Sequence, residues 1–390
     1  MEKIILHLDM NNFFASCTLL SFPQYKNLPV AISGHIDKQH GIILAKNEIA
    51  KNYGIKTAET VISANKKCKN LILLKSDYDK YAYYSKKINS IYARWTDVIE
   101  PFSIDESWLD ITKIAKDFSD AEKIAFNIKG TIKKETGLTL SCGVSFNKIF
   151  AKMGSGYKKP DAITVITKEN YKKTIWPLPI ARLFGVGKKT AVKLISLGIN
   201  TIEELANYDT KILVAHIGKI GTDLKSYADG TENSPVVPMD KKETIKSISH
   251  GKTFEKNIFG IDEIKERITP LADKVIKRLN EQQLLANGIK VEIKDPNFYI
   301  LSKQKKTKEN MNTSEKITNE SLELIKELNF ENKKIRAITV GLFALSEKIG
   351  TDPNFIYEVK KNAKNMKLDA TINSIKSKLG EKSLKRLSDL

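Results

Sequence analysis

Cysteine is scarce in this 390-residue chain: Cys17, Cys68 and Cys142 stand far apart and in no paired spacing. Neither a disulfide framework nor a zinc site is indicated, and a reducing cytoplasm fits this usage. Long hydrophobic runs are also lacking, so no segment is expected to span a bilayer. The first ten residues hold a very short apolar stretch between charges, which indicates a buried strand and not a signal peptide. These absences favour a soluble protein with no membrane partner.

Positive charge, in contrast, is abundant. Lys and Arg together number 65 against 46 Asp and Glu, a formal net charge of +19. Such a field attracts polyanions, which makes nucleic acid the leading partner class. The alternative is a lysine-rich surface that merely reflects biased composition. The length exceeds one ordinary core, so two to four packed units are expected.

Strands and helices alternate in the first part of the chain. Residues 3–9 read as a buried strand that ends at Asp9, and residues 11–20 begin a helix with asparagines at its cap. Residues 20–77 carry short apolar strands and a helix, typical of a small mixed subdomain. Residues 78–165 return to longer helices around a hairpin and a strand, so two packed layers are expected there.

The texture changes near Trp176, where short helices separated by glycine turns predict an all-helical module. A polar, proline-containing stretch then reads as a linker. Beyond it the order is strand, helix, strand, strand, helix, strand, which predicts four strands under two helices. The first of these helices has one apolar face that must be buried, formed by Ile264, Ile268, Leu271, Val275 and Leu279. A lysine-rich tail follows from Thr351.

Three acidic residues lie where rigid elements end or turn. Asp9 ends the first strand, and Asp105 and Glu106 are adjacent at the turn of a hairpin. Two-metal phosphoryl transfer uses cations about 4 Å apart, and Mg²⁺ prefers oxygen ligands, so a few carboxylates on strand ends suffice. An Asp-Glu pair in a hairpin is otherwise most often a solvated turn.

Five sequence blocks together resemble one family. They are LDMNNFFAS, AKNEIAKNYGIKTAET, FSIDESWLDI, CGVSFNKIFAKMGSGYKKP and the GVG segment at 185–187. Their order and spacing resemble those of Y-family DNA polymerases of the DinB (DNA polymerase IV) type over residues 1–350. The resemblance implies an α/β (α+β) multidomain right hand. Its expected parts are a palm (1–19 and 78–165), fingers (20–77), a helix-hairpin-helix thumb (166–233), a linker (234–240), a four-stranded, two-helix little finger (241–349) and a basic tail (350–390).

The activity implied by this resemblance is template-directed addition of dNTPs to a primer 3′-OH in translesion synthesis. Low fidelity is expected, with no proofreading, since no segment is left over for an exonuclease. The implied partners are primer–template DNA, dNTPs and two Mg²⁺ ions, and the chain is expected to act as a monomer.

Carried over by position, Asp9, Asp105 and Glu106 match the family's metal-binding carboxylates, and the backbone carbonyl of Met10 matches a further ligand. Ser103 is expected to support the hairpin. Asp110 reads as structural, because the family pattern gives it no metal role.

The nucleotide is expected to meet two aromatic residues and two lysines. Phe14 falls at the family's steric gate, a ring that leaves no room for a 2′-hydroxyl, and Phe13 lies beside it. Either ring could instead be a core aromatic, and the register with Asp9 favours Phe14. Lys159 matches the lysine that reaches the triphosphate.

The fingers depart from the family pattern. Many relatives have Tyr-x-x-Arg on the fingers helix, whereas this chain has Glu48 and Lys51. A carboxylate and a point charge therefore replace a hydroxyl and a bidentate donor. Lys51 is retained as an expected phosphate contact, and Glu48 is assigned no role.

The helical module carries the expected DNA contact. Gly185 and Gly187 allow a tight turn, amides at the next helix start can bind a phosphate, and Lys188 and Lys189 add charge. A glycine-closed helix turn without a ligand is the alternative. DPNFIYEV at 352–359 is a hypothetical sliding-clamp motif.

Two rival functions remain at this point. One is a two-metal nuclease with a helix-hairpin-helix clamp, which has no use for an aromatic gate. The other is a catalytically inactive DNA-binding scaffold, against which the three intact carboxylates argue. A primer-extension assay distinguishes the three functions, because a polymerase elongates the primer, a nuclease shortens it and an inactive scaffold does neither.

Overall fold

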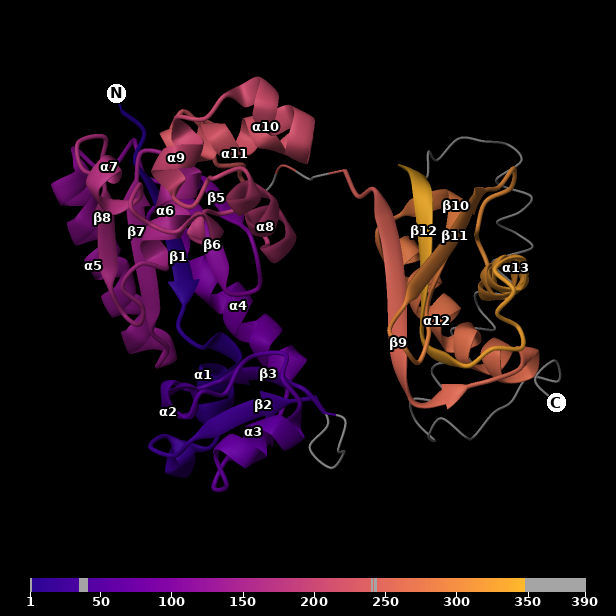
Figure 1. Cartoon of the computed structure of the whole chain (residues 1–390). Coiled ribbons are helices and arrows are strands. Elements are labelled where there is room, and N and C mark those ends of the chain that lie inside the picture. The colour runs from indigo at the N-terminus through magenta and orange to yellow at the C-terminus, as the bar shows by residue number, and fades with distance from the viewer. Residues whose placement is uncertain (1, 35–40, 240, 242–243, 348–390) are drawn as a thin grey trace. The chain divides into compact units, whose positions relative to one another are not determined.

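A computed structural model of the chain describes residues 2–34, 41–239, 241 and 244–347 (Figure 1). The chain forms two compact units that divide between residues 242 and 243. Each unit has a hydrophobic core of its own. In the described residues no helix is both long and apolar enough to cross a membrane. The tail after residue 347, with the candidate clamp motif at 352–359, lies outside the described residues.

A five-stranded sheet forms the centre of the first unit, and β1 lies in its middle (Figure 1). The strand order is β5-β6-β1-β7-β8, with β7 and β8 parallel and the other pairs antiparallel. Every residue of β1 is buried, as its apolar sequence predicts. The strands are β1 (Ile5–Met10), β5 (Ile99–Pro101), β6 (Glu106–Asp110), β7 (Leu140–Ser145) and β8 (Ile163–Ile166).

The two faces of β1 meet different surroundings. Leu6, Leu8 and Met10 enter the main core with residues of α4 (Tyr78–Tyr92) and α5 (Phe118–Thr136). Both of these helices begin at an aspartate, Asp77 or Asp117, whose side chain accepts a backbone N–H of the first turn. Ile5, His7 and Asp9 lie on the opposite face, since side chains alternate along a strand.

Helix α6 (Lys148–Ser155) packs closely against that opposite face. Asn147 caps it by accepting the N–H of Phe150 at 2.7 Å. A Cβ on Gly143 of β7 would lie 1.8 Å from the carbonyl oxygen of Ala151, and one on Gly154 would lie 3.0 Å from the Gly143 Cα. The two glycines therefore let helix and sheet backbones touch.

A smaller sheet of order β3-β2-β4 follows α1 in sequence. Asn12 stands at the cap position of α1, but its φ is +49° and its side chain makes no capping bond. Asn12 therefore takes the predicted cap position without forming a capping bond, and its amide donates to Glu48 instead. The elements are α1 (Phe13–Leu19), η1 (Pro23–Tyr25), β2 (Val30–Ser33), β3 (Ile43–Lys46), α2 (Glu48–Asn52), α3 (Val61–Lys67) and β4 (Ile72–Lys75).

Short helices complete the first unit, as the glycine-rich texture predicts. Their core is shared with the outer side of α6, where Ile149 and Phe150 are buried among them together with Phe146. The elements are α7 (Tyr171–Thr174), η2 (Ile180–Arg182), α8 (Lys188–Ser196), α9 (Ile202–Ala206), α10 (Thr210–Ile217) and α11 (Ile220–Asp229).

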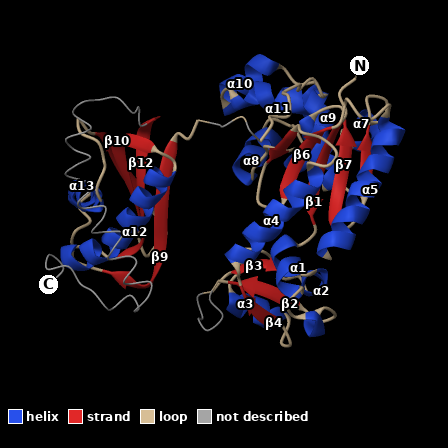
Figure 2. Cartoon of the chain, turned by 180° about the vertical axis from the view of Figure 1, so that it is seen from behind, coloured by secondary structure: helices blue, strands red, loops and turns tan. Residues whose placement is uncertain are grey.

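The second unit is a four-stranded antiparallel sheet with two helices (Figure 2), as the element order predicts. The predicted apolar stripe of its first helix is confirmed, since all five residues are at most 2% exposed. The strand order is β11-β10-β12-β9. The elements are β9 (Ser247–Ile258), α12 (Ile261–Glu281), β10 (Leu284–Lys294), β11 (Ile300–Lys306), α13 (Ser314–Glu327) and β12 (Ile335–Glu347).

Two lysines of β11 do not lie as free cations on this sheet. Lys303 pairs with Glu327 at 2.8 Å, and Lys305 pairs with Glu320 and Glu323 at 2.6 and 2.9 Å, all on α13. Their charge is shared with these glutamates. Strand alternation turns both toward the helices.

Replacing Gly143 with alanine is expected to destabilise the first unit by about 3 kcal/mol, because α6 must move away from β7. Gly130→Ala is the control, since Gly130 lies in α5 with nothing within 4 Å of a new Cβ. Its effect is expected to be neutral or slightly stabilising. Urea unfolding followed by circular dichroism measures both, and equal stabilities would contradict the close contact.

Candidate active site

The register between β1 and β6 brings the predicted carboxylates together. Asp9 is the direct partner of Glu106 in the antiparallel pair. The next N–H along, that of Met10, donates to the carbonyl of Asp105 at 3.1 Å. Residues almost a hundred positions apart thus meet at one end of the sheet.

Each carboxylate has a partner of its own. The Lys159 ammonium lies 2.5 Å from Asp9, and the Lys152 ammonium lies 2.7 Å from Glu106. The Ser103 hydroxyl donates to Asp105 at 2.6 Å, in keeping with its predicted support of the hairpin. In the described part of the chain no three His, Cys, Asp or Glu side chains close around a single point. Ammonium and hydroxyl groups take the places next to the carboxylate oxygens.

Burial raises the pKa of two of these carboxylates, Asp9 and Asp105. Desolvation raises the pKa of Asp9 to about 7, with a further contribution from neighbouring Glu106, while Lys159 opposes the shift. Desolvation also raises the pKa of Asp105, against the hydrogen bond from Ser103. A buried carboxylate cluster is short of positive charge, which is the condition that a bound cation relieves.

The donor set suits a hard divalent cation. Asp9, Asp105 and Glu106 offer only carboxylate oxygens, the ligands that Mg²⁺ prefers. The side chain of Met10 is buried in the core at 2% exposure. Its carbonyl is therefore the group left to serve the site, as the resemblance implies.

Phe14 and Phe13 lie differently, although they are adjacent in α1. The Phe14 ring stacks on Tyr81 with centroids 4.1 Å apart and an interplanar angle of 8°. Tyr81 is buried and is fixed in turn by a 2.8 Å bond between its hydroxyl and that of Thr18. Phe13 is 3% exposed and belongs to the core. The expected contact of Phe13 with a nucleotide stays a prediction. Because the ring is buried, only the Phe13 backbone could make this contact.

Glu48, to which sequence reasoning assigned no role, connects α2 to α1. Its carboxylate accepts from the Asn12 amide at 3.1 Å and pairs with Lys51 at 3.3 Å. Lys51 remains 55% exposed at its side chain. The expected contact of Lys51 with a phosphate stays a prediction. Lys51 would have to leave its ion pair with Glu48, or keep it, while it binds the phosphate.

The glycine loop of the helical module exposes a helix start. Gly185 has φ +86° and Gly187 is the N-cap of α8, which no side chain caps. Lys188 and Lys189, the first two residues of α8, are exposed. The first amides of α8 are thus open to an anion, as expected for a phosphate contact.

Sequence reasoning missed the two lysines of α6 and the rings that surround them. Lys148 and Lys152 are four residues apart, so they share one helix face, and this spacing is the signal that could have found them. His7, behind them in β1, is fully buried and bonds Ser155 at 2.7 Å. Burial, together with Lys152 and Lys159, holds the pKa of His7 well below its usual value.

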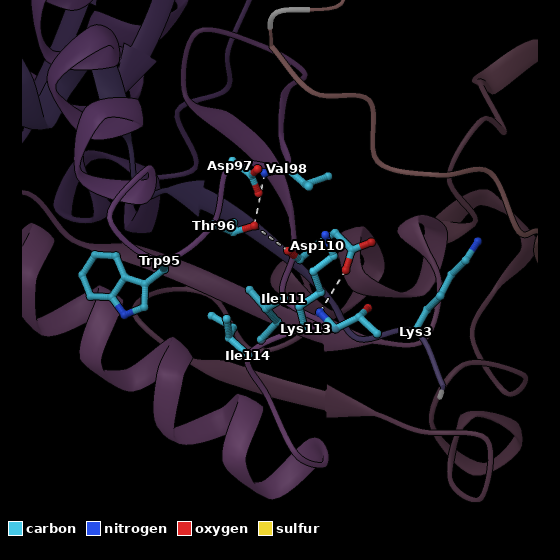
Figure 3. A pocket seen from close by; sticks show the side chains of 10 residues that line it. Lys3, Trp95, Thr96, Asp97, Val98, Asp110, Ile111, Lys113 and Ile114 are labelled. Carbon is cyan, nitrogen blue, oxygen red and sulfur yellow. Dashed lines mark hydrogen bonds between the residues drawn. The ribbon is translucent and has the colours of Figure 1, made fainter.

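A separate cavity of about 330 Å³ lies at the other end of β6 (Figure 3). Lys3, Trp95 and Asp110 are among the residues that line it, and none of the three predicted metal ligands does. Asp110 accepts the N–H of Thr112 at 2.9 Å, a structural contact.

The metal-free protein should show a pH-dependent stability that Asp9 causes. The folded state keeps the Asp9 proton up to about pH 7, whereas the unfolded state releases it near pH 3.9. Stability from this group is therefore full below that lower value and is lost as pH rises toward 7. Asp9→Asn, which cannot ionise, should gain stability relative to the unsubstituted protein between pH 5 and pH 7.5.

Urea unfolding at the two pH values, with a chelator present, measures this difference. Asp110→Asn is the control, because Asp110 lies at the far end of β6. A pH dependence that Asp9→Asn leaves unchanged would contradict the raised pKa.

Comparison with known proteins places this site in a family. Residues 8–156 match the impB/mucB/samB family and residues 245–352 match the C-terminal domain of the same family. The first match spans all three carboxylates together with Phe14 and Lys152.

Relatives match along nearly the whole chain. DNA polymerase IV of Acetivibrio thermocellus is 38% identical, over 99% of this chain and 97% of that protein. DNA polymerase IV of Clostridium kluyveri is 33% identical, over 99% and 98%. A solved Y-family DNA polymerase chimera of Dbh and Dpo4 has a TM-score of 0.81 at 25% identity, covering 88% of this chain and 100% of that one. The chain therefore belongs to the impB/mucB/samB family, the Y-family DNA polymerases of the DinB (DNA polymerase IV) type.

Proposed function

We propose that this translesion DNA polymerase extends a primer with dNTPs by using two Mg²⁺ ions held by Asp9, Asp105, Glu106 and the carbonyl of Met10. Y-family polymerases need divalent metal ions, and the number and identity of the ions are part of the proposal. The observation that carries it is the β1–β6 register, which sets Asp9 opposite Glu106. When bound, the ions would activate the primer hydroxyl and neutralise the triphosphate.

The side chains around the carboxylates complete the proposed site. Lys159 lies against Asp9, so its ammonium stands where a triphosphate would also reach, and it can move from carboxylate to phosphate. Lys51 would add a second cation from α2. Charge complementarity of this kind supplies most of the catalysis of phosphoryl transfer, because the protein contributes little covalent chemistry.

Phe14 is proposed as the steric gate. Its ring follows directly after the strand that bears Asp9 and is held by the stack on Tyr81. A ring so fixed cannot turn aside for a 2′-hydroxyl, whereas an unsupported ring could.

The parts of the right hand are proposed at the boundaries given by the sequence: palm 1–19 and 78–165, fingers 20–77, thumb 166–233 and little finger 241–349. The loop of Gly185 and Gly187, with Lys188 and Lys189, would hold a phosphate of primer–template DNA. Such contacts position a duplex without reading its sequence. The chain is proposed to act as a monomer.

Glu106→Gln is expected to lower primer extension by at least about 100-fold, since an isosteric amide removes the charge that a cation needs. DNA affinity should stay within about twofold, because phosphate contacts lie elsewhere. Extension of a labelled primer with Mg²⁺ and fluorescence anisotropy on the same DNA give the two quantities.

Asp110→Asn, at the other end of the same strand, should extend normally. Near-normal extension by Glu106→Gln would refute the metal assignment. Shortening of the primer by the unsubstituted protein would favour the nuclease that shares these ligands.

Phe14→Ala should raise the use of ribonucleotides relative to dNTPs by about 100-fold, because the gate ring is gone. Tyr81→Phe keeps the stacked ring and loses only the hydroxyl, so it should still reject ribonucleotides. Single-nucleotide insertion of rNTP and dNTP opposite the same template base measures the ratio. A Phe14→Ala variant that discriminates as before would move the gate to another residue.

A further inference from the structure

Lys152 of α6 forms a partly buried ion pair with one of the proposed metal ligands. Its ammonium lies 2.7 Å from Glu106, and its side chain is 17% exposed. A partly buried ion pair at this distance is stronger than a surface pair, because water screens it less. The lysine is thus a resident partner of a carboxylate that the proposed function gives to a metal ion.

Three aromatic rings surround the same ammonium. It lies 4.6 Å from the centroid of Phe102, 5.5 Å from that of Phe184 and 6.0 Å from that of Trp108. The rings also pack on each other, with Phe102 4.8 Å from Trp108 and 5.9 Å from Phe184. An ammonium within about 6 Å of a ring is attracted by its negative face. The aromatic cage of Phe102, Trp108 and Phe184 therefore attracts the Lys152 ammonium independently of the carboxylate.

Lys152 also has room to move. It lines a cavity of about 300 Å³ together with Tyr157, Arg182 and Phe184. The cavity is lined by the helical module and the end of α6, and the cage adds Phe102 from the β5–β6 hairpin and Trp108 from β6. A short shift would break the contact with Glu106 while the rings still held the charge.

Two of the three carboxylates of the site each have a lysine as partner. Asp9 and Glu106 face each other in the β1–β6 pair, and each has one lysine, Lys159 or Lys152. Two ammonium groups thus stand where divalent cations are proposed to bind. A cation at Glu106 and an ammonium 2.7 Å from the same carboxylate would repel each other strongly.

We propose that Lys152 is a built-in counter-ion of Glu106, which an incoming divalent cation displaces from the carboxylate while the aromatic cage retains the ammonium. Metal binding is then an exchange of an ammonium for a metal ion, and Lys152 lowers the affinity of the site for the metal. The inference rests on the metal-binding role of Glu106 proposed above. It adds a residue that occupies the place beside Glu106 before the cation arrives.

The test is the affinity for Mn²⁺ of the full chain without DNA or nucleotide, measured at pH 8 from the electron paramagnetic resonance signal of free Mn²⁺. Lys152→Met keeps the aliphatic stem and removes the charge. It should bind Mn²⁺ about tenfold more tightly, because the competing cation is gone. Lys152→Arg keeps a cation and should stay near the unsubstituted protein.

Lys148→Met is the matched control. Lys148 lies four residues earlier on α6, its ammonium is 4.6 Å from the Trp108 ring, and it pairs at 2.6 Å with Glu100, which is not a predicted ligand. Its removal should leave the Mn²⁺ affinity unchanged. Circular dichroism of each variant checks that the fold is kept, and Lys152→Gln replaces Lys152→Met if the latter fails to fold.

A second readout follows the ammonium itself. In a chain whose other tryptophans are replaced, Trp95→Phe and Trp176→Phe, Mn²⁺ should change the emission of Trp108 as Lys152 moves over the ring. Mg²⁺, which quenches less, should give the same change. The change should disappear in Lys152→Met.

The outcomes separate the two proposals. If the unsubstituted protein binds no Mn²⁺, or if Glu106→Gln binds it equally well, the metal role of the carboxylates fails. If Glu106→Gln loses binding while Lys152→Met binds as the unsubstituted protein does, or more weakly, the displacement of Lys152 fails alone.

Discussion

The antiparallel pairing of β1 with β6 is the constraint on which the site depends. Five consecutive pairs fix the register, from Ile5 opposite Asp110 to Asp9 opposite Glu106. Because side chains alternate, a slip of one residue would send Asp9 into the core and Leu8 toward the site. The burial of Leu6 and Leu8 forbids this slip. The packing of Leu6 and Leu8 on one face of β1 thereby fixes the position of Asp9 on the other face.

Carboxylates gathered at a buried strand end need positive charge nearby, since isolated buried ions are expensive. Helix α6 and the loop after it supply that charge through Lys152 and Lys159. The helix can do so because Gly143 and Gly154 remove the side chains that would hold it away from the sheet. The close contact between the backbones of α6 and β7 therefore also brings Lys152 to Glu106.

Much of the fold follows from local sequence patterns. The apolar run before Asp9, the stripe from Ile264 to Leu279 and the order of elements in the second unit each predict what is found. The meeting of Asp9 with Asp105 and Glu106 required the family resemblance, because strand pairing across a hundred residues leaves no local mark. Asn12 takes the cap position that the sequence predicts, but the sequence gives no sign of its left-handed backbone, in which the side chain makes no capping bond. Likewise, the side of the sheet on which Lys303 and Lys305 lie depends on register.

Tertiary contacts without a local signal account for the rest. The stack of Phe14 on Tyr81 joins α1 to α4, and the link from Glu48 to Asn12 joins α2 to the start of α1. The cage around Lys152 draws Phe102 from a hairpin and Phe184 from the helical module. Each partner is an ordinary residue by itself, and its role arises only when the chain is folded.

The two faces of α6 contact different parts of the first unit, and this determines where the chain can be truncated. Its Lys152 pairs with Glu106, while Ile149 and Phe150 on its outer side are buried by the short helices that follow. A chain shortened before those helices would expose the two apolar side chains to water and loosen the helix that carries the charge. The helical module thus supports the helix that carries Lys152, whereas the second unit, which begins after residue 242, has a core of its own.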